Sequence, residues 1–500
     1  MSAQPHKLST HPLFKTGYFA GGKWLKAKET FDVLDPATGD VVAKVAKAGK
    51  AETEAAVKAA SDAFPEWRKT TAKARSEILH RWYELMLENK QFLGELMVAE
   101  QGKPLKEALG EVDYAASYLQ WFSEEAKRAN GEIIPPAKSG SRILATREPV
   151  GVVAAITPWN SPIASEAQKM APALAAGNAV VVKPAEVTPL MALELAAICE
   201  EAGVPKGMIS VLPGKGSVIG DAITKHPLVR RVSFTGGTNT GRHIAHIAAD
   251  KMMPVSLELG GKSPTMVFED ADLDHAVNGV LYGIFSSSGE SCIAGSRLFV
   301  ARSLYEPFMD RLAAAAARLR VGNPADESTQ MGPLITDRHR ETIESYVAMG
   351  VEDGGHLRTG GLRPAITGCE SGYFYTPTII EGLTNSARIC QEEIFGPVLV
   401  AMPFDDEDEL IEQANDSVYA LAAGIWTRDY KRAWRIGRAV QAGNVWINTY
   451  KQFSISTPFG GWRDSGLGRE KGRLGILQYM EQKSLYWGLN EQPLAWANAN

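Results

Sequence analysis

A lone cysteine stands among small residues in the segment Gly289 to Arg297 (GESCIAGSR). A structural cysteine usually packs among bulky apolar side chains as a small, inert hydrophobe. Here glycine, alanine and serine leave room for a substrate atom to approach the sulfur of Cys292. A thiolate is a strong nucleophile, and glycine-rich backbone can direct N–H groups at an oxyanion that forms beside it. By itself the segment favours a catalytic cysteine only modestly over a tight turn.

A carboxylate precedes a pair of glycines in the segment Leu257 to Pro264 (LELGGKSP). Because Glu258 lies between leucines, we expect burial to raise the pKa of its carboxyl group, which suits a general base near neutral pH. A glutamate that is satisfied by a buried hydrogen bond would show the same pattern. The presence of Cys292 is what favours the base.

A strand-to-helix turn follows the apolar run 179–183 and carries residues suited to a nucleotide. Lys183 and Glu186 lie at the carboxyl end of this predicted strand, where open α/β sheets bind their ligands. A carboxylate there can accept both hydroxyls of an adenosine ribose and would repel the 2′-phosphate of NADP. A simple lysine–glutamate pair at the surface would look the same in the sequence.

A second turn, Phe234 to Gly241 (FTGGTNTG), also follows a strand and opens a helix. Glycines at such a turn let the backbone approach a pyrophosphate at the positive end of the helix. The spacing is not GxGxxG. Arg242 and His243 stand where a P-loop has lysine and serine or threonine, so the turn does not indicate an ATPase.

Length and composition exclude several classes of protein. A chain of 500 residues predicts two or three domains, and no apolar stretch approaches the length of a membrane span. With 53 basic and 58 acidic residues and no long basic run, binding to nucleic acid or to an anionic membrane has no support. Met1 to Thr10 lacks the apolar core of a signal peptide, and four scattered cysteines fit neither a disulfide framework nor a CxxC metal site. We expect a cytoplasmic protein.

The elements that must position these residues alternate along the chain. Helices are predicted from about residue 50, over 74–89 and around an aromatic stripe (Tyr114, Tyr118, Trp121, Phe122) that we interpret as core packing. Between 150 and 260 short apolar strands alternate with helices, which predicts βαβ units and a mostly parallel sheet. The predicted strands cover 150–157, 179–183, 209–212 and 231–234; the predicted helices cover 171–176, 188–200, 218–224 and 238–250. A second alternating stretch runs from about 262 to 460.

Further segments complete a pattern that closely resembles the aldehyde dehydrogenase superfamily. They are Pro158 to Asn160 (PWN), Glu392 to Pro397 (EEIFGP), Val445 to Asn448 (VWIN), Pro458 to Gly461 (PFGG) and Ser465 to Glu470 (SGLGRE), in family order across about 17–487. The resemblance implies an α/β fold with three parts. We expect a Rossmann-like NAD-binding domain (1–126 and 150–259), an α/β catalytic domain (260–461), and a small β oligomerisation element with a C-terminal tail (127–149 and 462–500).

Family members are usually dimers or tetramers in which that element extends the sheet of a neighbouring subunit. The resemblance therefore implies a homodimer or homotetramer. The alternating apolar pattern of 142–152 is compatible with a strand in this element.

The same resemblance assigns chemical roles. Cys292 attacks the aldehyde carbon, the side-chain amide of Asn160 and the backbone N–H of Cys292 hold the oxyanion, and hydride passes to the nicotinamide. Glu258 activates the water that hydrolyses the resulting thioester, and Lys169 and Glu470 match a proton-relay pair. No metal is required. NAD is the expected cofactor, with NADP possible because some members accept it despite a glutamate at this place.

The positions implied for the cofactor lie in four groups. Lys183 and Glu186 would hold the adenosine ribose, Gly216, Gly220 and Gly237 would line the pyrophosphate path, and Glu393 and Phe395 would position the nicotinamide ribose and ring. The remaining expected contacts are Ile156, Thr157, Trp159, Phe234, Gly236 and Leu259.

Four positions depart from the family pattern. Gly237 replaces a serine that donates to a phosphate, and Ser161 stands where phenylalanine is common. Glu290 replaces a glutamine and would raise the pKa of the thiol unless it points away or pairs with a cation. Gln168 stands where succinate-semialdehyde members carry an arginine for the substrate carboxylate, which argues against an acidic substrate.

Aromatic residues suggest the substrate class. Phe453 and Trp462, with Tyr118 and Trp121, indicate an aromatic or medium-chain aliphatic aldehyde, although each could equally be packing. A semialdehyde dehydrogenase and a CoA-acylating enzyme are the alternatives within the family, and the latter would lack Glu258. A cysteine hydrolase would leave the nucleotide turns unexplained. A silent family member would have lost Cys292, Glu258 or Asn160.

Overall fold

Apolar, β-branched runs between residues 150 and 260 form the middle of an eight-stranded sheet. The computed structural model describes residues 7–489 and Trp496, so residues 1–6 of the expected NAD-binding domain and 490–495 and 497–500 of the expected tail lie outside it. In spatial order the strands are β2 (Lys23–Leu25), β1 (Tyr18–Ala20), β9 (Ile209–Val211), β8 (Ala179–Lys183), β7 (Val152–Ile156), β10 (Val229–Thr235), β11 (Val255–Glu258) and β21 (Gly466–Leu467). The five central strands are parallel, while β1, β2 and β21 run antiparallel at the edges.

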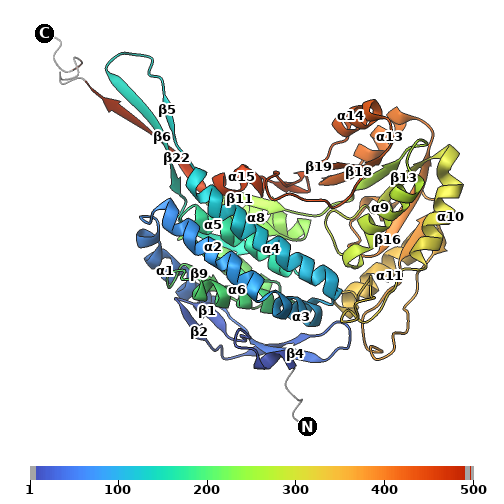
Figure 1. Ribbon diagram of the computed structural model, residues 1–500, viewed down its shortest axis with the longest axis horizontal. Helices are drawn as coiled ribbons and strands as arrows, with labels where there is room; N and C mark the ends of the chain where they lie inside the picture. Colours follow the sequence, from blue (N-terminus) through green and yellow to red (C-terminus); the bar gives the residue numbers. More distant parts are fainter. Residues whose placement is uncertain (1–6, 490–495, 497–500) are drawn as a thin grey trace.

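Helices cover both faces of this sheet (Figure 1). One face carries α5 (Pro162–Ala175) and α6 (Leu190–Glu201), on which α2 (Ala72–Glu88), α3 (Lys90–Gln101) and α4 (Leu105–Glu125) pack. The other face carries α1 (Lys50–Trp67), α7 (Gly216–Lys225) and α8 (Thr238–Asp250). A short hairpin of β3 (Thr30–Leu34) and β4 (Val41–Ala46) and the 3₁₀ turns η1 (Lys7–Thr10) and η2 (Ala126–Arg128) complete this part.

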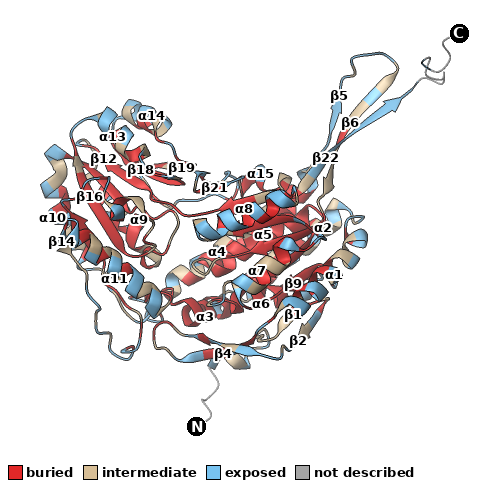
Figure 2. Ribbon diagram, turned by 180° about the vertical axis from the view of Figure 1, so that it is seen from behind, coloured by how far each residue is buried: buried red, intermediate tan, exposed pale blue. Residues whose placement is uncertain are grey.

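The second alternating stretch forms a seven-stranded sheet with its own core. Its order is β14 (His356–Thr359), β15 (Thr378–Glu381), β16 (Val398–Phe404), β13 (Arg297–Ala301), β12 (Pro264–Val267), β18 (Ala422–Trp426) and β19 (Asn444–Ile447). All its neighbours pair in parallel except β14, which is antiparallel. Figure 2 shows the strands of both sheets buried and the outer faces of the helices exposed.

The helices of this part are α9 (Leu273–Phe285), α10 (Tyr305–Ala316), α11 (Asp337–Glu352), α12 (Arg388–Gln391), α13 (Glu407–Asn415) and α14 (Tyr430–Ala439), with η3 (Ser286–Gly289) and η4 (Arg302–Leu304). A two-stranded pair, β17 (Tyr419–Ala420) with β20 (Trp462–Arg463), and the helix α15 (Gly472–Leu477) lead back toward the first sheet. The predicted α/β class is confirmed. Among the described residues, no helix is long and apolar enough to cross a membrane.

A three-stranded antiparallel ribbon projects from the body of the molecule (Figure 1). It consists of β5 (Glu132–Ile134), β6 (Ser141–Pro149) and β22 (Met480–Gly488), with β6 in the centre. The single strand predicted over 142–152 is wrong in its extent. Gly151 has φ +125, and the chain turns there from the ribbon strand β6 into the sheet strand β7.

Candidate active site

The parallel sheet brings the two nucleotide turns to one edge. Ile156 at the end of β7 pairs with Lys183 of β8 on one side and with Phe234 of β10 on the other. On the next strand along, Glu258 of β11 pairs with Thr235. Residues from segments about 100 positions apart therefore end at the same carboxyl edge, where open α/β sheets bind ligands.

The nucleophile segment follows a strained turn. In η3, Ser287 and Ser288 have φ of +53 and +54, a left-handed conformation that side chains other than glycine rarely adopt. Strain of this kind is concentrated at functional sites. The carbonyl of Cys292 then packs against Gly261, where an added Cβ would lie 2.2 Å from the carbonyl oxygen. Glycine at 261 is what lets the turn after β11 meet the cysteine.

The thiol of Cys292 is half-buried, whereas Cys199, Cys369 and Cys390 are buried. Burial raises its pKa to about 12, and the carboxyl groups of Glu393 and Glu258 add to the shift. The resting side chain is consequently a neutral thiol near pH 7, and it needs a base to become a nucleophile.

Glu290 does not act on the thiol. Its Oε1 accepts a hydrogen bond from the backbone N–H of Ile335 at 2.9 Å, and the side chain is almost fully buried. Burial raises the pKa of this carboxyl group well above its ordinary value, and the hydrogen bond from Ile335 opposes the shift. The carboxyl groups that raise the pKa of the Cys292 thiol are those of Glu393 and Glu258, and Glu290 is directed to Ile335 instead.

Asn160 lies beside the nucleophile segment. Its Nδ2 donates to the backbone carbonyl of Glu290 at 3.0 Å, and its own carbonyl accepts from Lys103 Nζ at 3.0 Å. Lys103 also forms a buried ion pair with Glu111. This chain of contacts from α4 holds the amide of Asn160 next to the residues that precede Cys292.

Glu258 ends β11 in a buried pocket, only 3% exposed. Burial raises the pKa of its carboxyl group well above the ordinary value, and the nearby Glu470 raises it further, while Lys169, Arg469 and Lys471 oppose the shift. Among the described residues neither carboxyl oxygen of Glu258 has a hydrogen-bond partner. The predicted raised pKa agrees with this geometry.

Lys169 and Glu470 form a fully buried ion pair, Nζ to Oε1 at 2.7 Å, and Ser233 bonds to both. The other oxygen of Glu470 accepts from Nε2 of Gln168, whose Oε1 accepts from the hydroxyl of Tyr118 at 2.7 Å. This network explains the glutamine at 168: both ends of its amide are engaged inside the protein.

A cradle forms where β8 faces the first turn of α7. The backbone N–H of Gly216 donates to Glu186 Oε1 at 2.8 Å, and a Cβ at Gly216 would lie 3.9 Å from Lys183 Nζ. Burial lowers the pKa of Lys183 to about 8. An added Cβ at Gly220 or at the exposed Gly237 would meet no atom within 4 Å, so the backbone of α7 and α8 is open to a pyrophosphate.

Other expected cofactor positions line the same edge. Gly236 donates its N–H to the carbonyl of Glu258 at 3.1 Å and packs on the ring of Phe234, and Leu259 covers the start of α8 at Gly241. The side chain of Thr157 points into the protein, because its hydroxyl donates to Glu166 at 2.7 Å.

Glu393 and Phe395 reach this edge from the second sheet. Glu393 Oε1 accepts from the backbone N–H of Gly261 at 2.9 Å, and burial raises the pKa of its carboxyl group to about 7. Phe395 has φ +60, and its ring lies edge-on to that of Trp159 at 5.3 Å. Glu393 therefore contacts the turn after β11 directly, although it belongs to the part of the chain that forms the second sheet.

A cavity of about 760 Å³ opens beside the nucleophile. Ser291 and Ile293, which flank Cys292, line its inner end, together with Ser161, Tyr114 and Phe453. Trp121 instead packs against the core of the first sheet, and Trp462 is 45% exposed on β20. Tyr114 packs against the core of the first sheet, as predicted, and also lines the cavity, whereas Tyr118 and Phe122 are fully buried. Trp462 and Trp121 do not line this cavity.

Two lysines near the cysteine were missed. Lys451 lines the cavity, and Lys471 lies under the rings of Phe453, Phe459 and Tyr114 at 4.0 to 5.2 Å, where burial lowers its pKa to about 7. The only signal in the sequence was the neighbourhood: Lys471 directly follows Glu470, and Lys451 follows the VWIN motif. Among the described residues, no group of three or more His, Cys, Asp or Glu could hold a metal ion.

Known proteins resemble this chain over nearly its whole length. The aldehyde dehydrogenase family pattern matches residues 24–485. The 3-sulfolactaldehyde dehydrogenase of Pseudomonas putida is 44% identical, over 96% of this chain and 99% of its own length. The NADP⁺-dependent succinate-semialdehyde dehydrogenase GabD of Escherichia coli K12 is 43% identical, over 97% and 100%. The structure of betaine aldehyde dehydrogenase from Staphylococcus aureus with NAD⁺ superimposes with a TM-score of 0.95 at 36% identity, covering 97% of each chain. The chain belongs to the aldehyde dehydrogenase family.

Proposed function

We propose that this enzyme oxidises an aldehyde to the carboxylic acid with NAD as the preferred hydride acceptor. The observation that carries the proposal is that Cys292, Asn160 and Glu258 lie together: the carboxyl group of Glu258 raises the pKa of the Cys292 thiol, and Asn160 bonds to Glu290, two residues before the cysteine. A thiol, an amide donor and a buried carboxyl group are the three groups that thioester chemistry needs.

In the proposed reaction the Cys292 sulfur bonds to the aldehyde carbon, and the thiol proton passes to a base. The Asn160 amide, which now donates to the Glu290 carbonyl, and the backbone N–H of Cys292 stabilise the oxyanion of the thiohemiacetal. Loss of hydride leaves a thioester on Cys292. Glu258 then takes a proton from the attacking water, the acid leaves, and the thiol is restored.

Lys169 and Glu470 are proposed to receive the proton from Glu258. The electrostatic coupling between Glu258 and Glu470 supports this role, because it shows that the two carboxyl groups lie close together, and the charge of Glu470 raises the pKa of Glu258 and so helps it to take up a proton. Their ion pair is buried, so the path begins inside the protein.

The residues of the cradle fit a dinucleotide. Lys183 and Glu186 would hold the adenosine ribose, Gly216, Gly220 and Gly237 would line the pyrophosphate, and Glu393, with Phe395, would position the nicotinamide riboside. Bound there, the cofactor supplies the hydride acceptor. The exposed side chain of Glu186 lies beside the start of α7, where it accepts from Gly216. Its charge there would repel a 2′-phosphate, which supports NAD over NADP.

For the substrate we propose a short aldehyde with an acidic group at its other end. The two relatives at 43–44% identity are named for 3-sulfolactaldehyde and succinate semialdehyde, both of which carry such a group. This favours the semialdehyde alternative over an aromatic or medium-chain aldehyde, and the absence of Trp121 and Trp462 from the cavity lining agrees with it.

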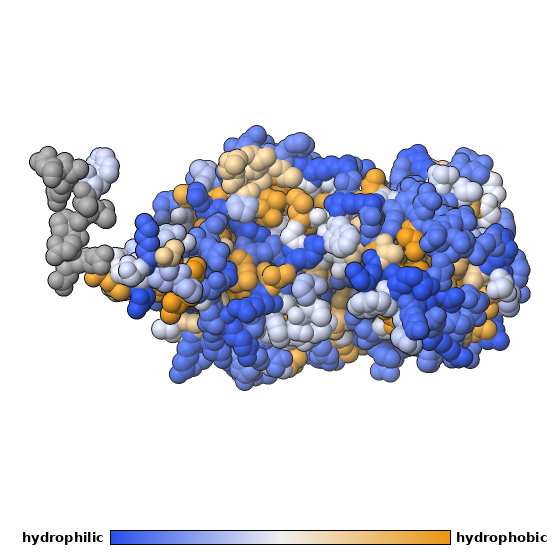
Figure 3. All heavy atoms as spheres, turned by 90° about the horizontal axis from the view of Figure 1, so that it is seen from above, coloured by the Kyte–Doolittle hydropathy of each residue, from blue (hydrophilic) through white to orange (hydrophobic). Residues whose placement is uncertain are grey.

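The assembly and the domain division are also proposals. The ribbon exposes Ile133 (79%), Tyr486 (76%) and Trp487 (63%) on strands with free edges, and Figure 3 shows hydrophobic side chains along it, at the left. A second copy of this chain would cover them, which supports a homodimer or homotetramer.

For the domain division we propose the expected bounds of 1–126 with 150–259, 260–461, and 127–149 with 462–500. Four free cysteines suit a reducing cytoplasm.

The test is a set of initial rates of NADH and NADPH formation without and with CoA. The aldehydes are succinic semialdehyde, glutaric semialdehyde, 3-sulfolactaldehyde, butanal and benzaldehyde. We expect CoA-independent NADH formation with an acidic aldehyde, which disappears in Cys292→Ala. Formation only with CoA would contradict thioester hydrolysis, and a best rate with benzaldehyde would contradict the substrate class.

A further inference from the structure

The substrate's acidic group needs a cationic partner that position 168 does not supply. Gln168 is uncharged, its Nε2 donates to Glu470, and its Oε1 accepts from Tyr118 at 2.7 Å. The amide is therefore fully engaged in the buried network around Lys169. An anion in the cavity must be held by another residue.

The cavity offers three cations, and two of them are unsuited to the task. Lys103 is buried in an ion pair with Glu111 and also donates to the carbonyl of Asn160, so its charge is already neutralised. Lys106 is exposed at the rim, where water and salt screen its charge. Lys451 remains.

Lys451 is half-buried and lines the cavity together with Ser291 and Ile293, the two neighbours of the nucleophile. Its Nζ donates to Ser286 Oγ at 2.8 Å and lies 5.9 Å from the centre of the Tyr282 ring. Among the residues that the structure describes, no carboxylate forms an ion pair with this ammonium group. The backbone holds the residue with φ +52, so its direction is imposed by the loop after β19.

Burial lowers the pKa of Lys451 to about 8, against the opposing effect of Glu107, which also lines the cavity. The carboxylate of Glu107 accepts from the backbone N–H of Ser287 at 3.0 Å and from its hydroxyl at 2.8 Å. Those two donors fix it to η3. The ammonium group of Lys451 donates to the hydroxyl of Ser286 and has further N–H donors that a ligand can use.

We infer that Lys451 determines substrate specificity by binding the acidic group of the aldehyde, carboxylate or sulfonate, while the aldehyde end lies at Cys292. A partly desolvated ammonium group forms charge-assisted hydrogen bonds that are about twice as strong as neutral ones. Ser286, Ser287 and Ser291 also line the cavity and make this part of its wall polar. This inference rests on the proposed aldehyde oxidation and names the residue that selects the substrate.

The experiment compares kcat/KM for acidic and uncharged aldehydes of matched length. Wild type, Lys451→Met, Lys451→Gln, Lys451→Arg and Lys106→Met are assayed with succinic semialdehyde, 3-sulfolactaldehyde and butanal. In Lys451→Met and Lys451→Gln we expect the ratio of acidic to uncharged kcat/KM to fall about 10- to 100-fold, mainly through KM. Lys451→Arg should keep most of the ratio, and Lys106→Met all of it. The acid with the larger loss identifies whether carboxylate or sulfonate is the natural group.

A binding measurement separates recognition from turnover. Succinate, a dicarboxylate without a reactive carbonyl, should slow the alkylation of Cys292 by iodoacetamide in wild type and not in Lys451→Gln. An unchanged substrate ratio in both neutral variants would overturn the role of Lys451 while leaving the aldehyde oxidation intact. An equal fall in Lys106→Met would also overturn it, since general positive potential would then suffice. Wild type that oxidises butanal better than both acids contradicts the substrate class itself, and wild type inactive on every aldehyde contradicts the proposed function.

Discussion

Burial shifts the pKa values of the site residues more than their charged neighbours do. Burial raises the pKa of Cys292, Glu258 and Glu290 and lowers that of Lys183, Lys451 and Lys471. All of these shifts favour the neutral form. In the resting site Cys292 is a neutral thiol, whereas Lys183 and Lys451, with a pKa of about 8, keep their charge near pH 7.

The thiol provides the first prediction at this scale. Because burial raises the pKa of Cys292 to about 12, the rate of alkylation by iodoacetamide should rise about tenfold per pH unit from pH 7 to 10, without a plateau. Cys292→Ala should abolish this reaction, since the other three cysteines are buried. A plateau below pH 8 would show a thiolate in the resting enzyme.

Glu258 provides the second. A carboxyl group whose pKa is raised on folding keeps its proton to a higher pH in the folded state than in the unfolded chain, where it loses the proton above about pH 4.5. Stability from this group is complete below pH 4.5 and is lost as the pH rises toward its folded pKa, by about 1.4 kcal/mol per pH unit. Glu258→Gln removes the titration, so its melting temperature should rise relative to wild type between pH 6 and 8. A constant difference would mean that Glu258 is ionised in the folded protein.

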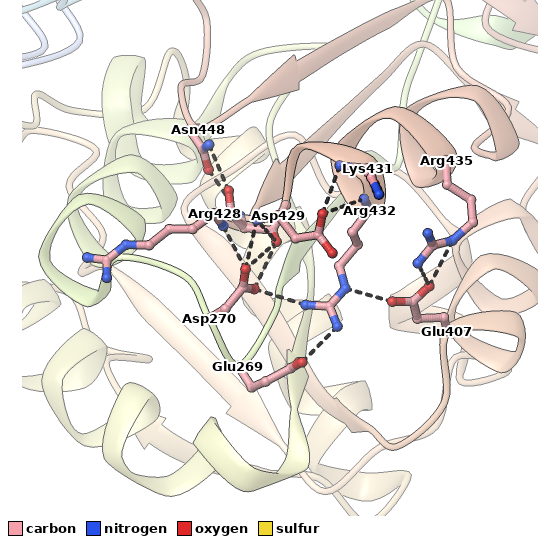
Figure 4. Close-up of polar contacts among 10 residues, drawn as sticks. Glu269, Asp270, Glu407, Arg428, Asp429, Lys431, Arg432, Arg435 and Asn448 are labelled. Atoms are coloured by element: carbon pink, nitrogen blue, oxygen red, sulfur yellow. Dashed lines mark hydrogen bonds and ion pairs between the residues drawn. The ribbon is translucent and has the colours of Figure 1, made fainter.

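At the scale of elements, turns at the carboxyl ends of strands hold the site. The cradle needs the end of β8 and the start of α7, and the nucleophile needs the turn after β11 against η3. The second sheet has a comparable junction outside the cavity (Figure 4): Arg432 of α14 bonds to Glu269 and Asp270 after β12 and to Glu407 of α13. Such junctions fix helices to strands, and the loops between them are then free to carry function.

The cradle predicts the effect of one charge on cofactor choice. Glu186→Gln should raise the ratio of kcat/KM for NADP to that for NAD about tenfold or more, because the repulsion of the 2′-phosphate is removed. The hydrogen bond to Gly216 can be kept by the amide oxygen, so the start of α7 should stay in place. Steady-state rates with each cofactor decide the matter, and an unchanged ratio would contradict the assignment of the ribose site.

The contact between the turn after β11 and the nucleophile segment predicts a loss on adding one methyl group. In Gly261→Ala the new Cβ would overlap the carbonyl oxygen of Cys292, and a displacement of about 1 Å at the reacting atom costs about 100-fold in rate. Gly437→Ala, in α14 with its nearest neighbour at 3.8 Å, is the matched control and should keep wild-type rates. Equal activity of the two variants would show that the two segments are not rigidly coupled.

At the scale of the whole molecule, the ribbon exposes apolar side chains and strand edges that no other part of the described chain covers. Its two outer strands have free edges, and its exposed side chains include Ile133, Tyr486 and Trp487. Exposed apolar edges of this kind favour pairing with another chain. In Figure 1 the ribbon projects away from α9, whose residues line the cavity, so assembly and chemistry can be tested separately.

The double variant Ile133→Glu with Trp487→Glu should lower the mass of the particle in light scattering toward that of one subunit, because two charges would be buried at the interface. Trp434→Glu, whose side chain is 68% exposed on α14, is the control and should leave the mass unchanged. A monomeric wild type would contradict the proposed assembly.

Much of the fold and site could be predicted from the sequence, because the signals are local. The strand over 179–183 and the helix over 238–250 have the predicted bounds, set by β-branched runs and by glycine at the helix start. The helix predicted over 171–176 is too short. In the structure α5 begins at Pro162, a favoured first-turn proline, and continues through Pro172 because the whole helix is buried against α4 and the sheet.

The tertiary structure alone decided which side chains that are distant in the sequence become partners. Glu290 is directed to the backbone N–H of Ile335, 45 positions away, and Gln168 is occupied by Glu470, 302 positions away. Lys451 meets Ser286 across 165 positions. The sequence by itself determined which residues can react, since periodicity, glycine spacing and residue type are local properties. Which of them are charged, and which substrate group they can hold, depends on burial and long-range contacts that form only on folding.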